Sequence, residues 1–287
     1  MQHHPIELVR VFPAAPGGGN PAPIVLAADG MSAQAMREVA RTYGHESGFV
    51  LRAEAGADFR MRYFVPGHEM EMCGHATVGA LWLLRRHGRW TTEEATVETP
   101  SGMVRGHVRH AGTPDEYVEI TQPAGRLQAL GREQVQAIAG VLRVHADDLL
   151  PLPVYNAATS RVKTLIGLRS VDALHALQPD FARMQALCEA IGSTGLYPYA
   201  ADPREARLFY ARQFPKSSGY PEDAATGIAA AALLFGLHAC DLIPADEGIT
   251  RVRQGYAMGA PSEIRLRFGL DAQGRPQGCT LGGAVTL

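Results

Sequence analysis

The sequence predicts an α+β protein with two pseudo-symmetric lobes, in each of which a curved, largely antiparallel sheet wraps around a central buried helix. Three observations lead to this prediction. Residues 59–84 return as residues 209–234, at an offset of 150 without a gap. The helical segments 76–86 and 228–237 are apolar on nearly every side, which is typical of helices buried all round. Short alternating segments, typical of strands, flank both helices.

The length and composition agree with two packed lobes. The chain has 287 residues, of which 46% are hydrophobic and 20% charged, and this is enough for two cores. The best boundary is the segment Gln122-Pro123-Ala124-Gly125. We therefore expect an N-terminal lobe at residues 1–125 and a C-terminal lobe at residues 126–287, with a last strand that can return to the first lobe.

Charge and cysteine usage exclude several classes of function. The formal net charge is −2 and there is no basic run, so neither nucleic acid nor an anionic membrane is an expected partner. Lys163 and Lys216 are the only lysines, which disfavours a Schiff-base or P-loop lysine. The four cysteines form no CxxC pair, which argues against a zinc site and a disulfide framework.

The N-terminus lacks the apolar core of a signal peptide, and the longest apolar run, 228–237, is too short for a membrane span. We expect a soluble, cytoplasmic protein.

In the first half, strands are expected at residues 6–12 and 22–26, around a glycine turn at 17–19. This turn leads into a strand, whereas a phosphate-binding loop opens a helix, so we interpret it as a tight turn with Asn20 at its exit. Residues 32–43 are predicted to form a helix with Ser32 as N-cap, ended by Gly44. Glu46 then lies where the chain enters the next strand.

The remaining elements follow the same signals of periodicity, glycine and proline. Strands are expected at residues 59–65, 95–98, 103–108, 116–121, 195–200, 207–213, 249–253, 263–268 and 279–287, with further strands within 155–168; helices are expected at 132–141 and at 171–191, the latter broken at Pro179.

Aligning the two copies of the repeat places Cys73 opposite Asp223 (223 − 73 = 150), each before the start of a buried helix. A helix N-terminus has unpaired N–H groups and partial positive charge, so it binds anions and lowers the pKa of a nearby acid or thiol. We expect both helix starts to face one cleft.

Six pieces of the chain, in order, resemble the PhzF-like proteins, the phenazine-biosynthesis isomerase family, which shares the two-lobed fold of diaminopimelate epimerase and proline racemase. They are VRVFPAAPGGGNPAPIVL at 9–26, HESGFVL at 45–51, VPGHEMEMCGHATVGA at 65–80, GYPEDAATGIAA at 219–230, RQGYAMGAPSEIRL at 253–266, and GCTLGGAV near the end. The resemblance implies an isomerase that moves a proton between carbons of a small anionic metabolite, without cofactor or metal, and commonly as a homodimer. It implies Glu46 as the proton shuttle, with His75 and Asp223 as further catalytic groups. The expected substrate-binding residues are Asn20, Cys73, Gly74, Thr226 and Gly227.

The chain departs from the family pattern EDPATGS at two positions. Ala224 replaces the proline and Ile228 replaces the serine, so a hydroxyl group that would help to bind substrate is missing. These changes argue against the phenazine precursor as substrate more than against the type of reaction.

Three alternatives stay open. Cys73 and Asp223 could act as the two acid/base groups of a cofactor-independent epimerase or racemase, although Cys73 alone is also explained as a small, buried apolar residue. Glu222 and Asp223 could cap a helix. The protein could also be a non-catalytic small-molecule binder in which Ile228 has spoiled the site.

Overall fold

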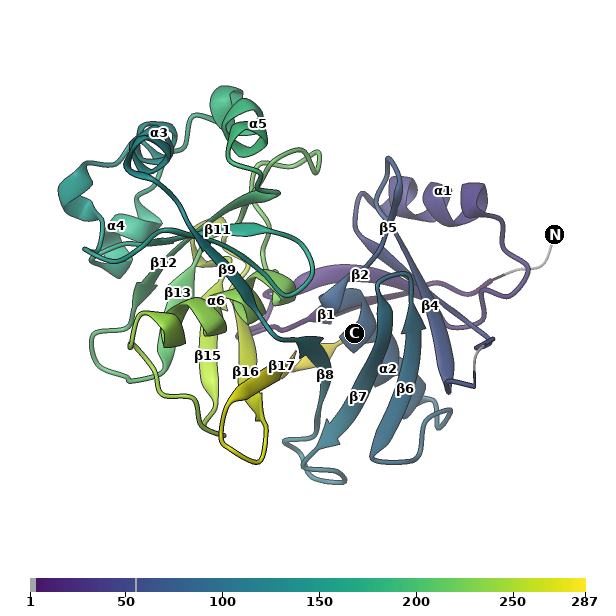
Figure 1. The fold of residues 1–287 in the computed structure, drawn as a ribbon. Helices are drawn as coiled ribbons and strands as arrows, with labels where there is room; N and C mark the ends of the chain where they lie inside the picture. The colour runs from purple at the N-terminus through teal and green to yellow at the C-terminus, as the bar shows by residue number, and fades with distance from the viewer. Residues whose placement is uncertain (1–3, 55) are drawn as a thin grey trace. The chain divides into compact units, whose positions relative to one another are not determined.

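The structure is a computed structural model that describes residues 4–54 and 56–287. Its contacts divide the chain into two units (Figure 1). The first unit extends to Thr121 and includes Leu281–Leu287, and the second comprises Gln122–Thr280. The chain enters the second unit within strand β8 (Tyr117–Pro123) and returns within β17 (Pro276–Gly283). The sequence placed this division a few residues later, at 125/126.

The first unit contains two helices and, besides parts of β8 and β17, eight described strands. The helices are α1 (Ala33–Tyr43) and α2 (Gly74–Arg86); the strands are β1 (Glu7–Val11), β2 (Asn20–Val25), β3 (Ser47–Leu51), β4 (Phe59–Phe64), β5 (Glu69–Met70), β6 (Glu94–Thr99), β7 (Gly102–Arg109) and β18 (Val285–Thr286).

The sheet of the first unit has α1 on one face and α2 on the other, as successive residues of β3 show. Phe49 packs with Met36 of α1 in one apolar cluster, whereas a Cβ atom at Gly48 would lie 3.3 Å from the Cβ of Ala76 in α2. Side chains alternate between faces along a strand, so β3 lies between the two helices. This explains why Ser47 to Val50 are all buried.

The second unit contains six helical segments and, besides parts of β8 and β17, eight strands. The helices are α3 (Arg132–Leu142), η1 (Ala146–Asp148), α4 (Val171–His175), α5 (Phe181–Ala190), α6 (Gly227–Ala239) and η2 (Tyr256–Met258); the strands are β9 (Arg126–Ala129), β10 (Tyr155–Ala158), β11 (Lys163–Gly167), β12 (Gly195–Ala201), β13 (Leu208–Ala211), β14 (Phe214–Pro215), β15 (Thr250–Gln254) and β16 (Ser262–Leu270).

The two units repeat one order of strand pairing. In the first, β1–β2, β3–β4 and β6–β7 are antiparallel, and β2–β3 and β4–β6 are parallel. In the second, β10–β11, β12–β13 and β15–β16 are antiparallel, and β11–β12 and β13–β15 are parallel. The long buried helix precedes the fifth strand of each series. The predicted α+β fold with a duplicated, helix-centred sheet is confirmed.

The central helices are buried as their composition predicts. Ten residues of α2 and eleven of α6 are buried. Glycine brings each helix close to a strand: a Cβ atom at Gly79 would lie 2.9 Å from Val9, and one at Gly236 would lie 2.5 Å from Leu165. Glycine costs about 0.5–1 kcal/mol relative to alanine within a helix, and here it permits packing that a larger residue would prevent.

The predicted offset of 150 throughout the repeat is wrong at the helices. Helix α2 begins at Gly74 and α6 at Gly227, so the helix starts are 153 residues apart (227 − 74 = 153). The segment between strand and helix is longer in the second unit. Consequently the N-cap residue that corresponds to Cys73 is Thr226, not Asp223.

The local signals for the other helices hold. The Ser32 side chain accepts a hydrogen bond from the N–H of Ala35 at 3.1 Å, and Gly44 ends α1 in the left-handed conformation with φ 69°. Residues 171–191 form two helices on either side of Pro179. Among the helices of the described residues, none combines the length and apolarity that a membrane span requires.

Candidate active site

Glu46 is held between a helix end and a buried strand. Gly44 turns the chain at the end of α1, and its N–H donates to the carbonyl of Ala40 at 2.9 Å. One residue beyond Glu46, the fully buried Ser47 begins β3, and its hydroxyl donates back to the carbonyl of His45 at 3.1 Å. The glutamate therefore lies on a short, fixed connection.

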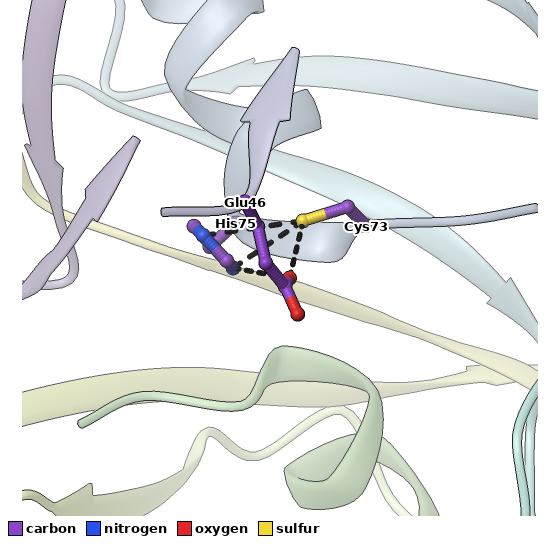
Figure 2. A group of neighbouring side chains, drawn as sticks. All are labelled: Glu46, Cys73 and His75. Carbon is purple, nitrogen blue, oxygen red and sulfur yellow. Dashed lines mark hydrogen bonds and ion pairs between the residues drawn. The ribbon is translucent and has the colours of Figure 1, made fainter. Parts of the chain in front are cut away.

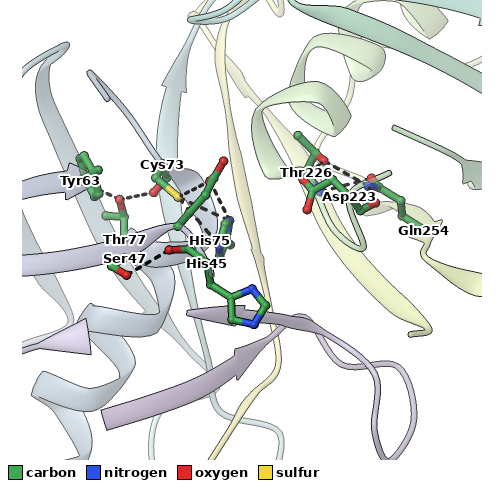
Figure 3. A network of polar contacts seen from close by, with 10 residues as sticks. His45, Ser47, Tyr63, Cys73, His75, Thr77, Asp223, Thr226 and Gln254 are labelled. Atoms are coloured by element: carbon green, nitrogen blue, oxygen red, sulfur yellow. Dashed lines mark hydrogen bonds and ion pairs between the residues drawn. The ribbon is translucent and has the colours of Figure 1, made fainter. Parts of the chain in front are cut away.

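The start of α2 is fixed by two buried hydroxyl groups (Figure 3). Thr77 donates from Oγ1 to the carbonyl of Cys73 at 2.8 Å, and the Tyr63 hydroxyl lies 2.7 Å from the same Oγ1, so Tyr63 is the donor in this second bond. Burial raises the pKa of Tyr63, although its bond to Thr77 opposes the shift. The phenol thus stays neutral and keeps its proton for this bond.

We expect Thr77→Val to lower the free energy of unfolding by about 1–3 kcal/mol, because the isosteric change leaves the Tyr63 hydroxyl buried without its acceptor. Adding Tyr63→Phe removes that orphaned group, so the double variant should be more stable than the sum of the single changes predicts, by at least about 0.5 kcal/mol. Urea unfolding of the parent, Thr77→Val, Tyr63→Phe and the double variant measures the coupling free energy between the two side chains. Additive effects would contradict the hydrogen bond between the Tyr63 and Thr77 hydroxyl groups.

The side chains of Glu46, Cys73 and His75 meet at the start of α2 (Figure 2). The Cys73 thiol donates to Glu46 Oε2 at 3.1 Å, and its Sγ lies 3.4 Å from His75 Nδ1. His75 Nδ1 lies 3.8 Å from Glu46 Oε2. Cys73 and His75 are almost fully buried, and 17% of the Glu46 side chain is exposed. Cys73 is small and buried, as its apolar interpretation predicts, but its thiol also contacts both ionisable neighbours.

The surroundings of the Glu46 side chain supply a hydrogen-bond donor and partial positive charge. Glu46 accepts the thiol hydrogen bond, and the N-terminus of α2 contributes partial positive charge. Burial, and then the charge of Arg10, lower the pKa of the adjacent His45, so His45 is neutral near pH 7. The cluster therefore combines one acceptor carboxylate, one thiol and one imidazole on a fixed backbone.

A second polar cluster lies at the start of α6, in the second unit (Figure 3). Thr226 donates from its hydroxyl to Asp223 Oδ2. Gln254, which is 1% exposed, donates from Nε2 to the Asp223 carbonyl at 2.7 Å and to Thr226 Oγ1 at 3.1 Å. Its Oε1 accepts from the Thr226 N–H at 3.2 Å and from the Tyr197 hydroxyl at 2.9 Å. Gln254 thus ties the end of β15 to the residues that precede α6.

The capping interpretation of Glu222 and Asp223 is wrong in its simple form. The N-cap of α6 is Thr226, and Asp223 accepts from the Thr226 side chain. Glu222 forms a two-bond ion pair with Arg212, at 2.9 Å from Nε and 2.7 Å from Nη2. Arg212 is 8% exposed and also donates to carbonyl groups at the end of α4, including that of Leu177 at 2.9 Å.

In the part of the chain that the structure describes, the first backbone N–H groups of α2 and α6 are not bonded by the side chains of their N-cap residues. Within residues 4–54 and 56–287, neither the Cys73 nor the Thr226 side chain caps its own helix. The N–H groups of Gly74 and Gly227 are the first of each helix, where no preceding turn supplies an acceptor, and such positions are suited to an anion. Ile228 is buried in the first turn of α6.

The structure thus joins three of the predicted site residues, Glu46, Cys73 and His75, in the first unit, and groups Asp223 with Thr226 in the second. Asn20 is buried and opens β2 opposite Val11. Sequence reasoning missed Gln254, Thr77 and Tyr63. The first two lie inside segments that were already singled out for their resemblance, 253–266 and 65–80, so a polar residue within an apolar pattern was the available signal.

Comparisons with known proteins agree over nearly the whole chain. The family model described as phenazine biosynthesis-like protein, PhzC-PhzF, matches residues 9–287. An uncharacterized isomerase of Deinococcus radiodurans is 34% identical over 90% of this chain and 84% of its own length. The trans-2,3-dihydro-3-hydroxyanthranilate isomerase of Pseudomonas chlororaphis is 29% identical over 95% and 91%. The crystal structure of a Bacillus anthracis PhzF-family protein has a TM-score of 0.89 at 24% identity, covering 100% of this chain and 97% of that one.

Proposed function

The chain belongs to the phenazine biosynthesis-like PhzC-PhzF family and is an isomerase, and from this premise we propose that it moves a proton between two carbon atoms of a small carboxylate metabolite, with Glu46 as the acid/base. The observation that carries the proposal is the contact of the Glu46 carboxylate with the Cys73 thiol and His75 at a helix start.

Removal of a proton from carbon needs a base that is held in place and a partner for the charge that develops. Glu46 meets the first need because the end of α1 and the buried start of β3 fix its position. His75 can meet the second, since its imidazole can donate a hydrogen bond to the reacting part of the substrate, while the Cys73 thiol orients the Glu46 carboxylate. In this proposal Glu46 takes the proton from one carbon and returns it to another.

The substrate carboxylate is assigned to backbone N–H groups. We assign this role to the N–H group of Gly74, at the start of α2, because the N-cap side chain of that helix is engaged by Glu46. For the second unit we propose Thr226 and Gly227 as substrate-binding residues. For Asp223 we propose a supporting catalytic role, and for Asn20 a role in substrate binding. The predicted homodimer, cytoplasmic location and independence from cofactors stay predictions.

The test is turnover in ²H₂O. Candidate substrates are trans-2,3-dihydro-3-hydroxyanthranilate, named for the Pseudomonas relative, and a panel of small amino- and hydroxycarboxylates with an adjacent double bond. We expect deuterium at the carbon that receives the proton, measured by NMR of the product. Turnover of every active substrate without exchange, together with full activity of Glu46→Gln, would contradict the proposal. Both results are needed because internal return of the proton can hide exchange.

The thiol of Cys73 supports a second candidate, a cofactor-independent epimerase, since the thiol is placed beside the acid/base group. Because Thr226 is the N-cap that corresponds to Cys73, the symmetry of the repeat no longer argues for Cys73 and Asp223 as the two acid/base groups of this candidate. A fully active Cys73→Ala would eliminate the thiol mechanism. Ligand-induced thermal stabilisation without turnover of any substrate in the panel would support the non-catalytic binder.

A further inference from the structure

We propose that Glu46, Cys73 and His75 form a binding site for Zn²⁺. The three residues offer a carboxylate oxygen, a sulfur and an imidazole nitrogen, and these ligand atoms all lie within 4.8 Å of one another. This site was not expected from the sequence, because zinc patterns pair cysteines at short spacing. Here a Cys-x-His pair is completed by a glutamate 27 residues away.

The separations of the three ligand atoms match one face of a tetrahedron around zinc. Zn–S bonds of about 2.3 Å and Zn–N or Zn–O bonds of about 2.0–2.2 Å place tetrahedral ligand atoms about 3.3–3.7 Å apart. The structure has 3.1 Å between sulfur and oxygen, 3.4 Å between sulfur and nitrogen, and 3.8 Å between nitrogen and oxygen. Shifts of roughly half an ångström in the separations of these atoms complete the geometry.

The fold also positions the three ligand residues before a metal binds. All three belong to the first unit, and the Cys73 backbone is fixed through Thr77 and Tyr63. Cys73 and His75 are almost fully buried, whereas the Glu46 side chain is partly exposed. The fourth position of the tetrahedron is therefore left for water or an atom of a ligand, as in open zinc sites.

The ligand set selects zinc among common divalent ions. Mg²⁺ and Ca²⁺ prefer oxygen ligands, whereas zinc accepts sulfur, nitrogen and oxygen together. Coordination requires the thiolate, so the Cys73 proton passes to solvent as the Zn–S bond forms. One thiolate, one carboxylate and a neutral imidazole then balance the charge of Zn²⁺, so the occupied site carries no net charge in a largely buried position.

Zinc in this position inhibits the isomerase, because it occupies the Glu46 oxygen that would accept the proton. This consequence rests on the proposed function, but the binding of the metal does not. Inhibition should be competitive with substrate and reversed by EDTA.

The experiment uses Co²⁺ as a spectroscopic substitute for zinc. The full chain is freed of metal with EDTA and titrated with Co²⁺, and we expect one ion per chain with thiolate-to-cobalt charge-transfer absorption in the near ultraviolet. Zn²⁺ should displace the ion, because it binds such sites more tightly than Co²⁺. Cys73→Ser should abolish the absorption, and Glu46→Gln should weaken binding at least about 10-fold. Cys240→Ser is the control, since Cys240 is a partly exposed cysteine at the end of α6 and its loss should change nothing.

Absence of a thiolate band, or a band that survives in Cys73→Ser and disappears in Cys240→Ser, would overturn the site. Should Cys73→Ser not fold, Glu46→Gln and His75→Gln decide the matter through their affinities, and unchanged affinity in both would overturn it. Activity that is lost in EDTA and restored by Zn²⁺ would overturn the inhibitory role. A Cys73-dependent band in a protein that isomerises nothing would refute the proposed function and leave the metal site standing.

Discussion

Glu46→Gln should reduce kcat by about 10²- to 10⁴-fold and reduce the incorporation of solvent deuterium by the same factor, because the amide cannot take up the proton that a general base removes. The change preserves the size of the side chain. It also preserves an oxygen that can accept the Cys73 hydrogen bond, so the fold and substrate affinity should be little altered. Single-turnover measurements in ²H₂O separate the loss of chemistry from a loss of binding.

The matched control is Glu71→Gln, which removes the same charge from an exposed position two residues before Cys73. It should retain wild-type exchange, and thermal unfolding of both variants should resemble that of the parent. A Glu46→Gln protein that keeps more than about a tenth of the wild-type exchange rate falls outside the range expected for loss of a general base. Should Cys73→Ala lose exchange while Glu46→Gln keeps it, the acid/base group is the thiol.

The sequence was sufficient for the parts of the fold that depend on one segment at a time. Helix α1 carried its N-cap Ser32 and its terminating Gly44, and both act as predicted. The central helices were recognised because a helix without a polar face has to be buried. The strands β5, β14 and β18 escaped prediction as separate elements, because two residues are too few to show a period.

The repeat was recognised correctly, but its register was not. Identities such as Phe59 with Phe209 and Leu84 with Leu234 were consistent with one gap-free offset. These identities show which two segments form the repeat, but they do not show the length of the loop between strand and helix. Loops tolerate insertions at little energetic cost, and the three additional residues before α6 moved Asp223 away from the position that matches Cys73.

The site was predicted where a motif supplied it and missed where only packing reveals it. Glu46 and His75 are 29 residues apart in sequence, yet they converge because β3 and α2 pack together. Sequence alone does not show that the Cys73 thiol points at both of them rather than into the core. Gln254 is similar, since a glutamine in a strand reveals its role only through the four bonds that satisfy its amide.

Glu222→Gln should lower the free energy of unfolding by about 3 kcal/mol, near the lower end of the range for removing one member of a buried ion pair. Only about 9% of each side chain of the Arg212–Glu222 pair is exposed. The neutral amide leaves the Arg212 charge without its counter-charge, because the other partners of the guanidinium are neutral carbonyl groups. Urea unfolding measures the loss. Glu222 directly precedes Asp223, for which we propose a supporting catalytic role. A displaced Glu222 should therefore also reduce substrate turnover.

The exposed pair Arg41–Glu38 provides the comparison, because its side chains are about 60% exposed. Glu38→Gln makes the same chemical change in solvent and should cost no more than about 0.5 kcal/mol. Replacing both buried partners, as in Arg212→Met with Glu222→Leu, removes the stranded charge, so the double variant should be more stable than Glu222→Gln. If Glu222→Gln lowers the free energy of unfolding no more than Glu38→Gln does, other groups must stabilise the Arg212 charge. The ion pair would then not be what fixes the segment before α6.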